Sequence, residues 1–368
     1  MPERKNICIT INSLAPGGAE KQSLLLAKAL RPYHNATVVI INPKPCYEAH
    51  VTVINNEGLD HVFLSKNPVR KFYQFQGFLK TRKIDIIFAF LPTDTIWASI
   101  CGKICGVPYI FGGIRNSHIA YAKYAALRFV NNNLLDYTIA NNYAAYESAI
   151  EFGFKKKVMV VPNGIEMRPM RQTVNASKTI SIISVGRLVR QKDYETALKA
   201  ILELKNLTEK AYSLRYRIVG SGPEQQHIET LVESFGLNNE VELITDPHNI
   251  YELLESSDIY LCTSTFEGIS NSIMEAMNCS LPVVATDAGD NSRLVLHGQT
   301  GFLAKIGDFQ ELANFLFEMI ESPKERTQMG IKGYDHLADG FSYETFQKRY
   351  LKLIENIGEI EIVDGIFR

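Results

Sequence analysis

Length, composition and charge limit the class of protein. A chain of 368 residues with 46% hydrophobic and 21% charged residues is typical of a soluble globular protein of about two domains. It contains no run of roughly 18 apolar residues, as a transmembrane helix requires, no apolar core of a signal peptide and no pair of CxxC motifs for structural zinc, so we expect a cytoplasmic protein.

The net charge of −1 hides an asymmetry between the two halves. Residues 1–165 contain 19 Lys and Arg against 10 Asp and Glu, whereas residues 166–368 contain 20 against 30. A basic half indicates an anionic partner, such as nucleic acid, an anionic membrane or a phosphorylated substrate; uneven surface charge without function is the alternative. Because no recognised nucleic-acid motif is present, we expect no nucleic-acid partner.

The first elements predict a parallel α/β sheet. An apolar strand over Ile7–Ile11 is followed by a glycine turn, an amphipathic helix over Ala19–Leu30 and a second strand over Ala36–Ile41. The turn glycines, Gly17 and Gly18, permit close approach of a phosphate to the helix N-terminus. The second strand ends without the acidic residue that holds a ribose in nicotinamide enzymes, which disfavours an NAD-linked oxidoreductase.

Residues 69–83 are expected to form a helix in which cations alternate with aromatic side chains. The cations are Arg70, Lys71, Lys80, Arg82 and Lys83, and the aromatic residues are Phe72, Tyr73, Phe75 and Phe78. Two interpretations stay open: a helix that lies at a membrane interface, or a helix whose aromatic residues face the core while its cations face water.

Two further strands, over 84–91 and 107–112, lead to a candidate binding loop. The loop after the second strand contains Arg115 and His118. In α/β sheets, ligands bind at the carboxyl ends of the strands, so these side chains are candidates to contact phosphate and sugar. A lone histidine is often structural, so the prediction depends on position. A helix over 120–136 and a strand over 136–140 follow, and the segment 158–164 closes this half.

After a polar stretch at 168–178, which we interpret as an interdomain linker, strands and helices alternate again. The predicted strands are 180–185, 214–219, 241–244, 258–262 and 282–286, with a short edge segment at 301–303. A glycine-rich loop beginning at Gly220 follows the second of them. The chain is predicted to end as helix from Phe309 to about Ile357.

The stretch 264–282 combines two glutamates with a helix start. Glu267 lies in a glycine-bearing turn after a buried strand, and Glu275 lies about two turns into the next helix. Ser270, Asn271 or Ser272 can cap that helix, whose free amides and dipole favour an anion. The arrangement suits a ligand with both an anion and hydroxyl groups, such as a nucleotide sugar; two ordinary surface glutamates are the alternative.

Several motifs, in order along nearly the whole chain, resemble retaining glycosyltransferase family 4. The stretch from Glu267 through Glu275 to Thr286 is similar to that family's signature. The other matches are Ala15-Pro-Gly-Gly-Ala-Glu20, Val160-Val-Pro-Asn-Gly-Ile165, Val185-Gly-Arg-Leu188 with Gln191-Lys-Asp193, and Phe341-Ser-Tyr-Glu-Thr-Phe346. Each match is weak by itself, and together they are specific.

The resemblance implies the GT-B architecture, in which two Rossmann-like α/β domains with parallel sheets face each other across a cleft. The N-terminal, acceptor-binding domain is expected over 1–168 and the C-terminal, donor-binding domain over 169–344, with a final helix over about 345–368 that packs back on the first domain. No metal or other cofactor is expected, because a cation pair takes the place of a metal at the donor diphosphate.

The resemblance also implies roles for individual residues. Arg187 and Lys192 match the pair that holds the donor diphosphate, Glu275 matches the ribose ligand, and Glu267 matches a carboxylate near the donor sugar. The region of the active-site histidine contains His118. The remaining expected donor contacts are Gly17, Gly18, Gly220, Gly268, Ile269, Ser270, Asn271 and Ser272, and Arg115 is the candidate contact for acceptor or phosphate.

The predicted function is transfer of a hexose or N-acetylhexosamine from a nucleoside-diphosphate sugar to a hydroxyl of a glycan or polyprenyl-linked acceptor in cell-surface polysaccharide synthesis. Ile244-Thr-Asp246 replaces a glycine that the family often has where the nucleobase is bound; we favour uridine over guanosine. Peripheral contact of the basic half with the inner face of the membrane is expected. The alternatives are a nucleotide-sugar-binding protein without catalysis and the disfavoured oxidoreductase.

Overall fold

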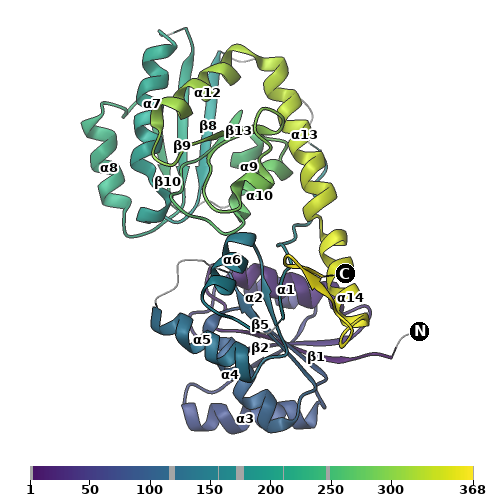
Figure 1. The fold of residues 1–368 in the computed structure, drawn as a ribbon. Helices are drawn as coiled ribbons and strands as arrows, with labels where there is room; N and C mark the ends of the chain where they lie inside the picture. Colours follow the sequence, from purple (N-terminus) through teal and green to yellow (C-terminus); the bar gives the residue numbers. More distant parts are fainter. Residues whose placement is uncertain are drawn as a thin grey trace. The chain divides into compact units, whose positions relative to one another are not determined.

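A computed structural model describes residues 3–115, 121–155, 157–170, 178–209, 211–245 and 249–367. The chain divides into two compact units (Figure 1). Unit 1 comprises Met1–Gly164 and Tyr343–Arg368, and unit 2 comprises Ile165–Ser342. The C-terminal segment therefore belongs to the same unit as the N-terminus. The sequence-based expectation placed the boundaries after 168 and after 344, whereas the two units divide after Gly164 and after Ser342.

Unit 1 is built on seven parallel strands, among the described residues, in the order β3-β2-β1-β4-β5-β6-β7. Strands and helices alternate along the chain, as the sequence predicts. The elements are β1 Asn6–Ile11, α1 Gly18–Leu30, β2 Asn35–Ile40, α2 Glu48–Asn56, β3 Asp60–Phe63, α3 Pro68–Thr81, β4 Ile86–Ala89, α4 Pro92–Cys105, β5 Tyr109–Ile114, α5 Tyr121–Asn133, β6 Tyr137–Ala140, α6 Tyr143–Glu151, β7 Lys157–Val160, α14 Tyr343–Glu355, β14 Ile362–Val363 and β15 Ile366–Phe367.

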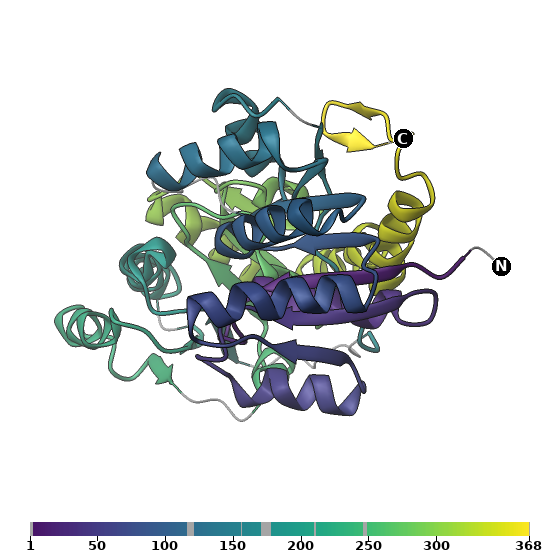
Figure 2. The ribbon, with the colours of Figure 1, turned by 90° about the horizontal axis from the view of Figure 1, so that it is seen from below.

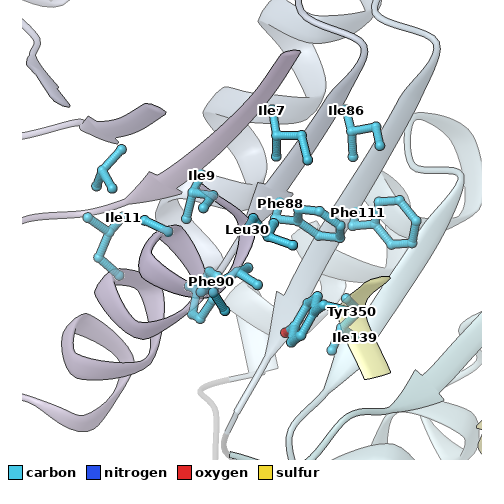
Figure 3. Packing of buried hydrophobic residues seen from close by; sticks show 14 of the residues in the cluster. Ile7, Ile9, Ile11, Leu30, Ile86, Phe88, Phe90, Phe111, Ile139 and Tyr350 are labelled. Atoms are coloured by element: carbon cyan, nitrogen blue, oxygen red, sulfur yellow. The ribbon is translucent and has the colours of Figure 1, made fainter. Parts of the chain in front are cut away.

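Helices cover both faces of this sheet, because successive side chains of a strand point to opposite faces. Ile7 and Ile9 of β1 belong to the core shared with α1 and α14, whereas Cys8 belongs to the core under α3, α4 and α5. The strand register aligns Ile9, Phe88 and Phe111 in one row, and Tyr350 of α14 packs edge-on against Phe88 at 5.5 Å between ring centroids (Figure 3). This contact attaches the C-terminal helix to unit 1.

Unit 2 has a second parallel sheet, in the order β10-β9-β8-β11-β12-β13. Because the order reverses direction between β8 and β11, the loops after these strands meet at a topological switch point. The elements are β8 Thr179–Val185, η1 Arg190–Lys192, α7 Tyr194–Leu207, β9 Ser213–Val219, α8 Gln225–Ser234, β10 Val241–Ile244, α9 Ile250–Glu255, β11 Ile259–Cys262, α10 Asn271–Asn278, β12 Val283–Thr286, α11 Asn291–Leu294, β13 Gly301–Ala304, α12 Phe309–Glu321 and α13 Pro323–Phe341.

The expectation of continuous helix from Phe309 to about Ile357 is wrong in detail. Three helices, α12, α13 and α14, occupy this stretch, and they are interrupted at Ser322 and at Ser342. Both serines leave the helical conformation, and Pro323 opens α13 at a position where its missing amide costs no hydrogen bond.

The C-terminal hairpin of β14 and β15 was not predicted, although the sequence carries its signal. Asp364 and Gly365 both have positive φ, as a two-residue hairpin turn requires. The carbonyl of Gly365 accepts a hydrogen bond of 2.7 Å from the amide of Val160, so the hairpin covers the edge strand β7.

The predicted linker starts too early. Arg168 is part of the packed structure of unit 2, because its amide donates to Asn278 at 2.9 Å and its guanidinium donates to Glu255 at 2.7 Å. Residues 171–177 of that stretch lie outside the described residues.

Candidate functional site

The candidate donor residues of unit 2 lie on loops at the carboxyl edge of its sheet. The loop after β8 contains Arg187 and leads into η1 with Lys192, and the loop after β11 contains Glu267. These two strands are neighbours in the sheet, so their loops lie next to each other. The sequence had predicted the residues of each loop; the sheet order supplies their proximity.

Lys192 and Glu267 form an ion pair that is largely shielded from water. Lys192 Nζ lies 2.5 Å from Glu267 Oε1, and the two side chains are 17% and 10% exposed. The Ser264 hydroxyl donates to the same carboxylate oxygen at 2.7 Å. The carboxylate is thus held by a cation and a hydroxyl, the kind of satisfaction that a buried charge requires.

Lys192 stays cationic in this setting. Burial by itself lowers the pKa of Lys192, but the negative charge of Glu267 and the hydrogen bond to it outweigh burial, so the pKa lies above its usual value. Arg187, whose side chain is exposed, lowers the pKa of Lys192 by charge repulsion. Two cations therefore lie close together at this edge, one buried and one facing solvent.

A set of backbone ties holds the two loops in register. The Thr263 hydroxyl donates to the carbonyls of Lys192 and Asp193, both at 2.9 Å. The Thr265 amide donates to the carbonyl of Gln191 at 2.8 Å, and the Gln191 side chain donates to the carbonyl of Phe266 at 2.7 Å. These residues position the ion pair. Sequence reasoning did not identify Thr263 or Thr265, because the residues that they contact lie 70 or more positions away in the chain.

Glycines allow the surrounding loops to approach each other. Gly220 has φ +147°, and a Cβ at this position would overlap the carbonyl oxygen of Gly186. Gly289 has φ +58°, and a Cβ there would overlap the carbonyl oxygen of Glu267. Gly220 was predicted as a site residue. Gly289 was not, although it restrains the backbone of a predicted one.

The helix α10 begins next to Glu267. Ser270 is its N-cap and accepts from the Ile273 amide at a long 3.5 Å, and its hydroxyl lies 3.2 Å from that of Ser272. Glu275 is buried within the helix. Burial first, and then the charge of Glu275, raises the pKa of Tyr251, so this glutamate lies near an aromatic ring.

The remaining predicted residues of unit 2 lie in the same segment. Gly268 accepts from the amide of Asp290 at 3.4 Å. Ile269 is buried, and Asn271 is the first residue of α10 and half-buried. Asp246 of the predicted nucleobase region lies outside the described residues.

In unit 1, the predicted residues lie at the carboxyl edge of the sheet. Gly17 is the N-cap and Gly18 the first residue of α1, and a Cβ on Gly17 would overlap the carboxylate of Glu20. Arg115 follows β5; its guanidinium donates to Asn163 at 3.0 Å and lies 4.2 Å from the ring centre of Phe90.

Neighbouring asparagines extend this arrangement of Arg115. Asn142 donates to the Arg115 carbonyl at 3.3 Å, and Asn141 donates to Asn163 at 3.3 Å. Arg115 is therefore held within unit 1 by several partners, and its contact with acceptor or phosphate stays a prediction. His118 lies outside the described residues.

Asp94, at the start of α4, is a fully buried carboxyl group beside this cluster. Burial raises its pKa to about 7, against the opposing effect of hydrogen bonds from the amides of Leu91 and Phe90 and of the charge of Arg115. Between its ordinary pKa and 7, the folded state binds more protons at this group than the unfolded state does. The contribution of Asp94 to stability therefore falls as pH rises through this window.

We expect Asp94→Asn to remove that pH dependence. The free energy of unfolding of the wild type, relative to the variant, should fall by a few kcal/mol between pH 5 and pH 8. Urea unfolding of both proteins at the two pH values measures this difference. Equal pH dependence in both proteins would show that the carboxyl does not titrate in this window.

Among the residues that the structure describes, no three His, Cys, Asp or Glu side chains gather as potential metal ligands. Within the same ranges, no helix has the length and apolar character needed to cross a membrane.

Comparison with known proteins agrees with this architecture. Anabaena Alr3699/HepE, in complex with UDP and glucose, superposes with a TM-score of 0.84 over 96% of this chain and 100% of that chain, at 20% sequence identity. Two Rossmann-like domains with parallel sheets and this structural neighbour define the fold as GT-B. The predicted fold class is confirmed.

Sequence comparison adds the family. Residues 168–336, most of unit 2, match the family Glycosyl transferases group 1. The lipopolysaccharide core biosynthesis glycosyltransferase LpsD of Rhizobium meliloti is 24% identical over 56% of this chain and 59% of its own length. An N-acetylgalactosamine-N,N'-diacetylbacillosaminyl-diphospho-undecaprenol 4-alpha-N-acetylgalactosaminyltransferase of Campylobacter jejuni is 26% identical over 86% of this chain and 91% of its own.

The chain is thus related to bacterial glycosyltransferases of polysaccharide synthesis, and unit 2 carries a group 1 glycosyltransferase domain. The alignments with three relatives, LpsD among them, span only 42% to 59% of those proteins' lengths. The predicted resemblance is confirmed at this level; membership of family 4 stays a prediction.

Proposed function

We propose that this protein is a retaining glycosyltransferase that moves a hexose or N-acetylhexosamine from UDP to a hydroxyl of a glycan or lipid-linked acceptor in cell-surface polysaccharide synthesis. The observation that carries the proposal is the shielded Lys192–Glu267 pair with Arg187 beside it. It joins cations for a diphosphate and a carboxylate for sugar hydroxyls at one sheet edge.

In this proposal the donor diphosphate binds Arg187 and Lys192. Guanidinium and ammonium groups neutralise the charge that grows on the leaving diphosphate, the part that a metal ion plays in other transferases, so the reaction needs no metal. Lys192 is already held in place by Glu267, Thr263 and the turn at Asp193. A cation fixed before the reaction stabilises the transition state without further reorganisation.

The other predicted residues bind the rest of the donor. Glu267 accepts hydrogen bonds from hydroxyls of the transferred sugar, and Glu275 accepts from the ribose. The backbone from Gly268 to Ser272 and the loop at Gly220 line the phosphate and sugar. From unit 1 we assign Gly17, Gly18 and His118 to the donor, and Arg115 to acceptor or phosphate.

The reaction breaks the bond from the anomeric carbon to the diphosphate oxygen and forms a bond from that carbon to the acceptor oxygen. The acceptor proton passes to the departing diphosphate, so no separate base is required. Attack from the face that the diphosphate leaves preserves the anomeric configuration.

Retention has its own test. The anomeric proton coupling of the product, read by nuclear magnetic resonance, should match that of the donor. An inverted product would exclude this route.

Relatives support the choice of donor and acceptor. HepE has been crystallised with UDP, with UDP and glucose, and with UDP-glucose, and the Campylobacter relative is named for an acceptor on diphospho-undecaprenol. We infer a uridine donor and an acceptor of the same broad kind for this protein. Because a lipid-linked acceptor lies in a membrane, we propose that the transfer reaction takes place at the cytoplasmic face of the membrane.

A thermal-shift panel of nucleotide sugars tests the donor. A ligand that binds only the folded state at 100 times its dissociation constant adds about 2.7 kcal/mol of stability, so the correct donor should raise the melting temperature above all others in the panel. Glu275→Ala should lose most of this shift for every uridine nucleotide. If no nucleotide sugar shifts the wild type, the proposed function is wrong.

A further inference from the structure

The outward side of the α3–α4–α5 layer is unusually apolar. Of the fifteen large hydrophobic side chains that are exposed in the described part of the chain, six lie on these three helices and two on the whole of unit 2. Figure 2 shows the three helices side by side on one face of the unit 1 sheet. We call their outward side the outer helix layer, and its apolar members are Val69, Tyr73, Ile100, Ile104, Tyr121 and Phe129.

Helical geometry explains why these residues face away from the sheet. In α3, Phe75 and Leu79 are buried against the sheet, while Tyr73, on the opposite side of the helix, is 68% exposed. In α4, Ala98 and Cys101 are buried, and Ile100 points away from them at 41% exposure. Each helix thus has a buried apolar side and a second, exposed one.

The layer also carries several positive charges and almost no acidic side chains. Its exposed cations are Arg70, Lys80, Lys103, Lys123 and Arg128, and the only acidic residue in the three helices is Asp94, which is fully buried. Lys103 lies 3.2 Å from Asp136 at the start of the next strand, so its charge is partly neutralised. The other cations lie on the same helices as the exposed apolar residues and, like them, are exposed.

We propose that the outer helix layer binds the surface of an anionic membrane. Exposed apolar and tyrosine side chains among cations fit a bilayer interface, where the apolar groups enter the boundary of the acyl chains and the cations meet anionic headgroups. A protein interface is less consistent with the pattern, because lysine is depleted from such interfaces. The proposal combines the two interpretations left open for residues 69–83: Phe75 and Lys71 are buried, whereas Tyr73, Arg70 and Lys80 form part of a docking surface.

Membrane binding is independent of the proposed transfer reaction, so it can be tested on the whole protein without substrate. The protein should sediment with vesicles of phosphatidylcholine and phosphatidylglycerol at low salt. It should sediment much less with vesicles of phosphatidylcholine alone. With the anionic vesicles, sedimentation should fall when the salt concentration is raised, because salt screens exposed charges.

Paired substitutions locate the surface. Arg70→Gln with Lys80→Gln should weaken vesicle binding at least fivefold, since one cation near an anionic surface contributes about fivefold in affinity. Ile100→Ser with Ile104→Ser should weaken it similarly. All four side chains are exposed, so these changes should leave the melting temperature nearly unaltered.

Matched controls lie elsewhere on the protein. Lys305→Gln with Lys324→Gln removes two exposed cations of unit 2. Val53→Ser with Ile306→Ser removes two exposed apolar side chains, one on α2 at the opposite face of the unit 1 sheet and one on unit 2. These controls should bind vesicles as the wild type does.

Three results would overturn the proposal. The first is that the wild type sediments with neither kind of vesicle, and the second is that the control variants lose as much vesicle binding as the paired variants. The third is that Ile100→Ser with Ile104→Ser changes the oligomeric mass and leaves vesicle binding intact, which would show that a second copy of the chain covers the layer. Donor-induced thermal shifts, measured on the same variants, report nucleotide-sugar binding, so failure of the membrane proposal can be distinguished from failure of the proposed function.

Discussion

Replacing Lys192 with alanine is expected to lower the rate of sugar transfer by about two to three orders of magnitude, the usual cost of losing one preorganised electrostatic contact to a developing charge. In the structure, Lys192 is cationic, shielded and fixed by Glu267, so no water or neighbouring side chain can replace it at low cost. Initial rates of UDP release, with acceptor and by hydrolysis, measure the effect. Arg187→Ala should show a smaller loss, because its exposed side chain acts in a more screened setting.

Loss of Lys192 also leaves Glu267 without its ion partner, which can destabilise the fold by about 3 kcal/mol. The double variant Lys192→Ala, Glu267→Gln separates the two effects, because it removes the stranded charge. It should recover melting temperature without recovering rate. Arg190→Ala, a neighbouring exposed cation 3.6 Å from Glu224, serves as the matched control and should keep its activity. If Lys192→Ala transferred sugar at nearly the wild-type rate, Lys192 would not stabilise the leaving diphosphate.

Much of the fold could be predicted from the sequence, because parallel strands buried on both faces form short, continuous apolar runs. Runs such as Ile7–Ile11 and Ile180–Val185 are of this kind. The strand β3 was missed since it lies at a sheet edge and most of its side chains are exposed, so it has no apolar run. The breaks at Ser322 and Ser342 were missed because the apolar periodicity continues on both sides of them.

The candidate site divides in the same way. Glu267, Glu275, Arg187 and Lys192 were predicted from local motifs and from the resemblance that these motifs carry. The ion pair between two of them was not, because 75 residues separate the partners and only the sheet order brings them together. Thr263 has no local signal at all, since its hydroxyl acts on backbone carbonyls of another loop.

The charge asymmetry of the sequence indicated the kind of partner but not the surface that binds it. The excess of cations in residues 1–165 indicated an anionic partner, yet cations occur on several elements of unit 1. The outer helix layer became visible only when burial separated Phe75, which faces the core, from Tyr73 and Ile100, which face solvent. Sequence periodicity could not assign the outward side of α4, because that helix has apolar residues on both sides.

Gly289→Ala is expected to impair both stability and transfer. A methyl group at this position would overlap the carbonyl oxygen of Glu267, and the alanine would have to adopt a φ of +58°. The loop after β12 must therefore move away from the loop after β11. Strain from the backbone conformation costs about 1 kcal/mol or more, and the overlap adds roughly 1–3 kcal/mol. Because Glu267 holds Lys192, the displacement should also reduce the transfer rate at temperatures where the variant is fully folded.

Gly298→Ala is the matched control for this substitution. Gly298 has φ +73°, but nothing lies within 4 Å of a Cβ built on it, so the variant carries the conformational strain without the overlap. Its melting temperature should fall by only a few degrees, since 1 kcal/mol corresponds to about 2–4 °C for a domain of this size, and its transfer rate should be unchanged. Equal melting temperatures and equal rates for the two variants would mean that the loop after β12 does not restrain Glu267. A lower rate in Gly289→Ala with donor-induced stabilisation retained would instead assign the effect of this glycine to the position of the transferred sugar, because binding of the nucleotide would then survive the displacement.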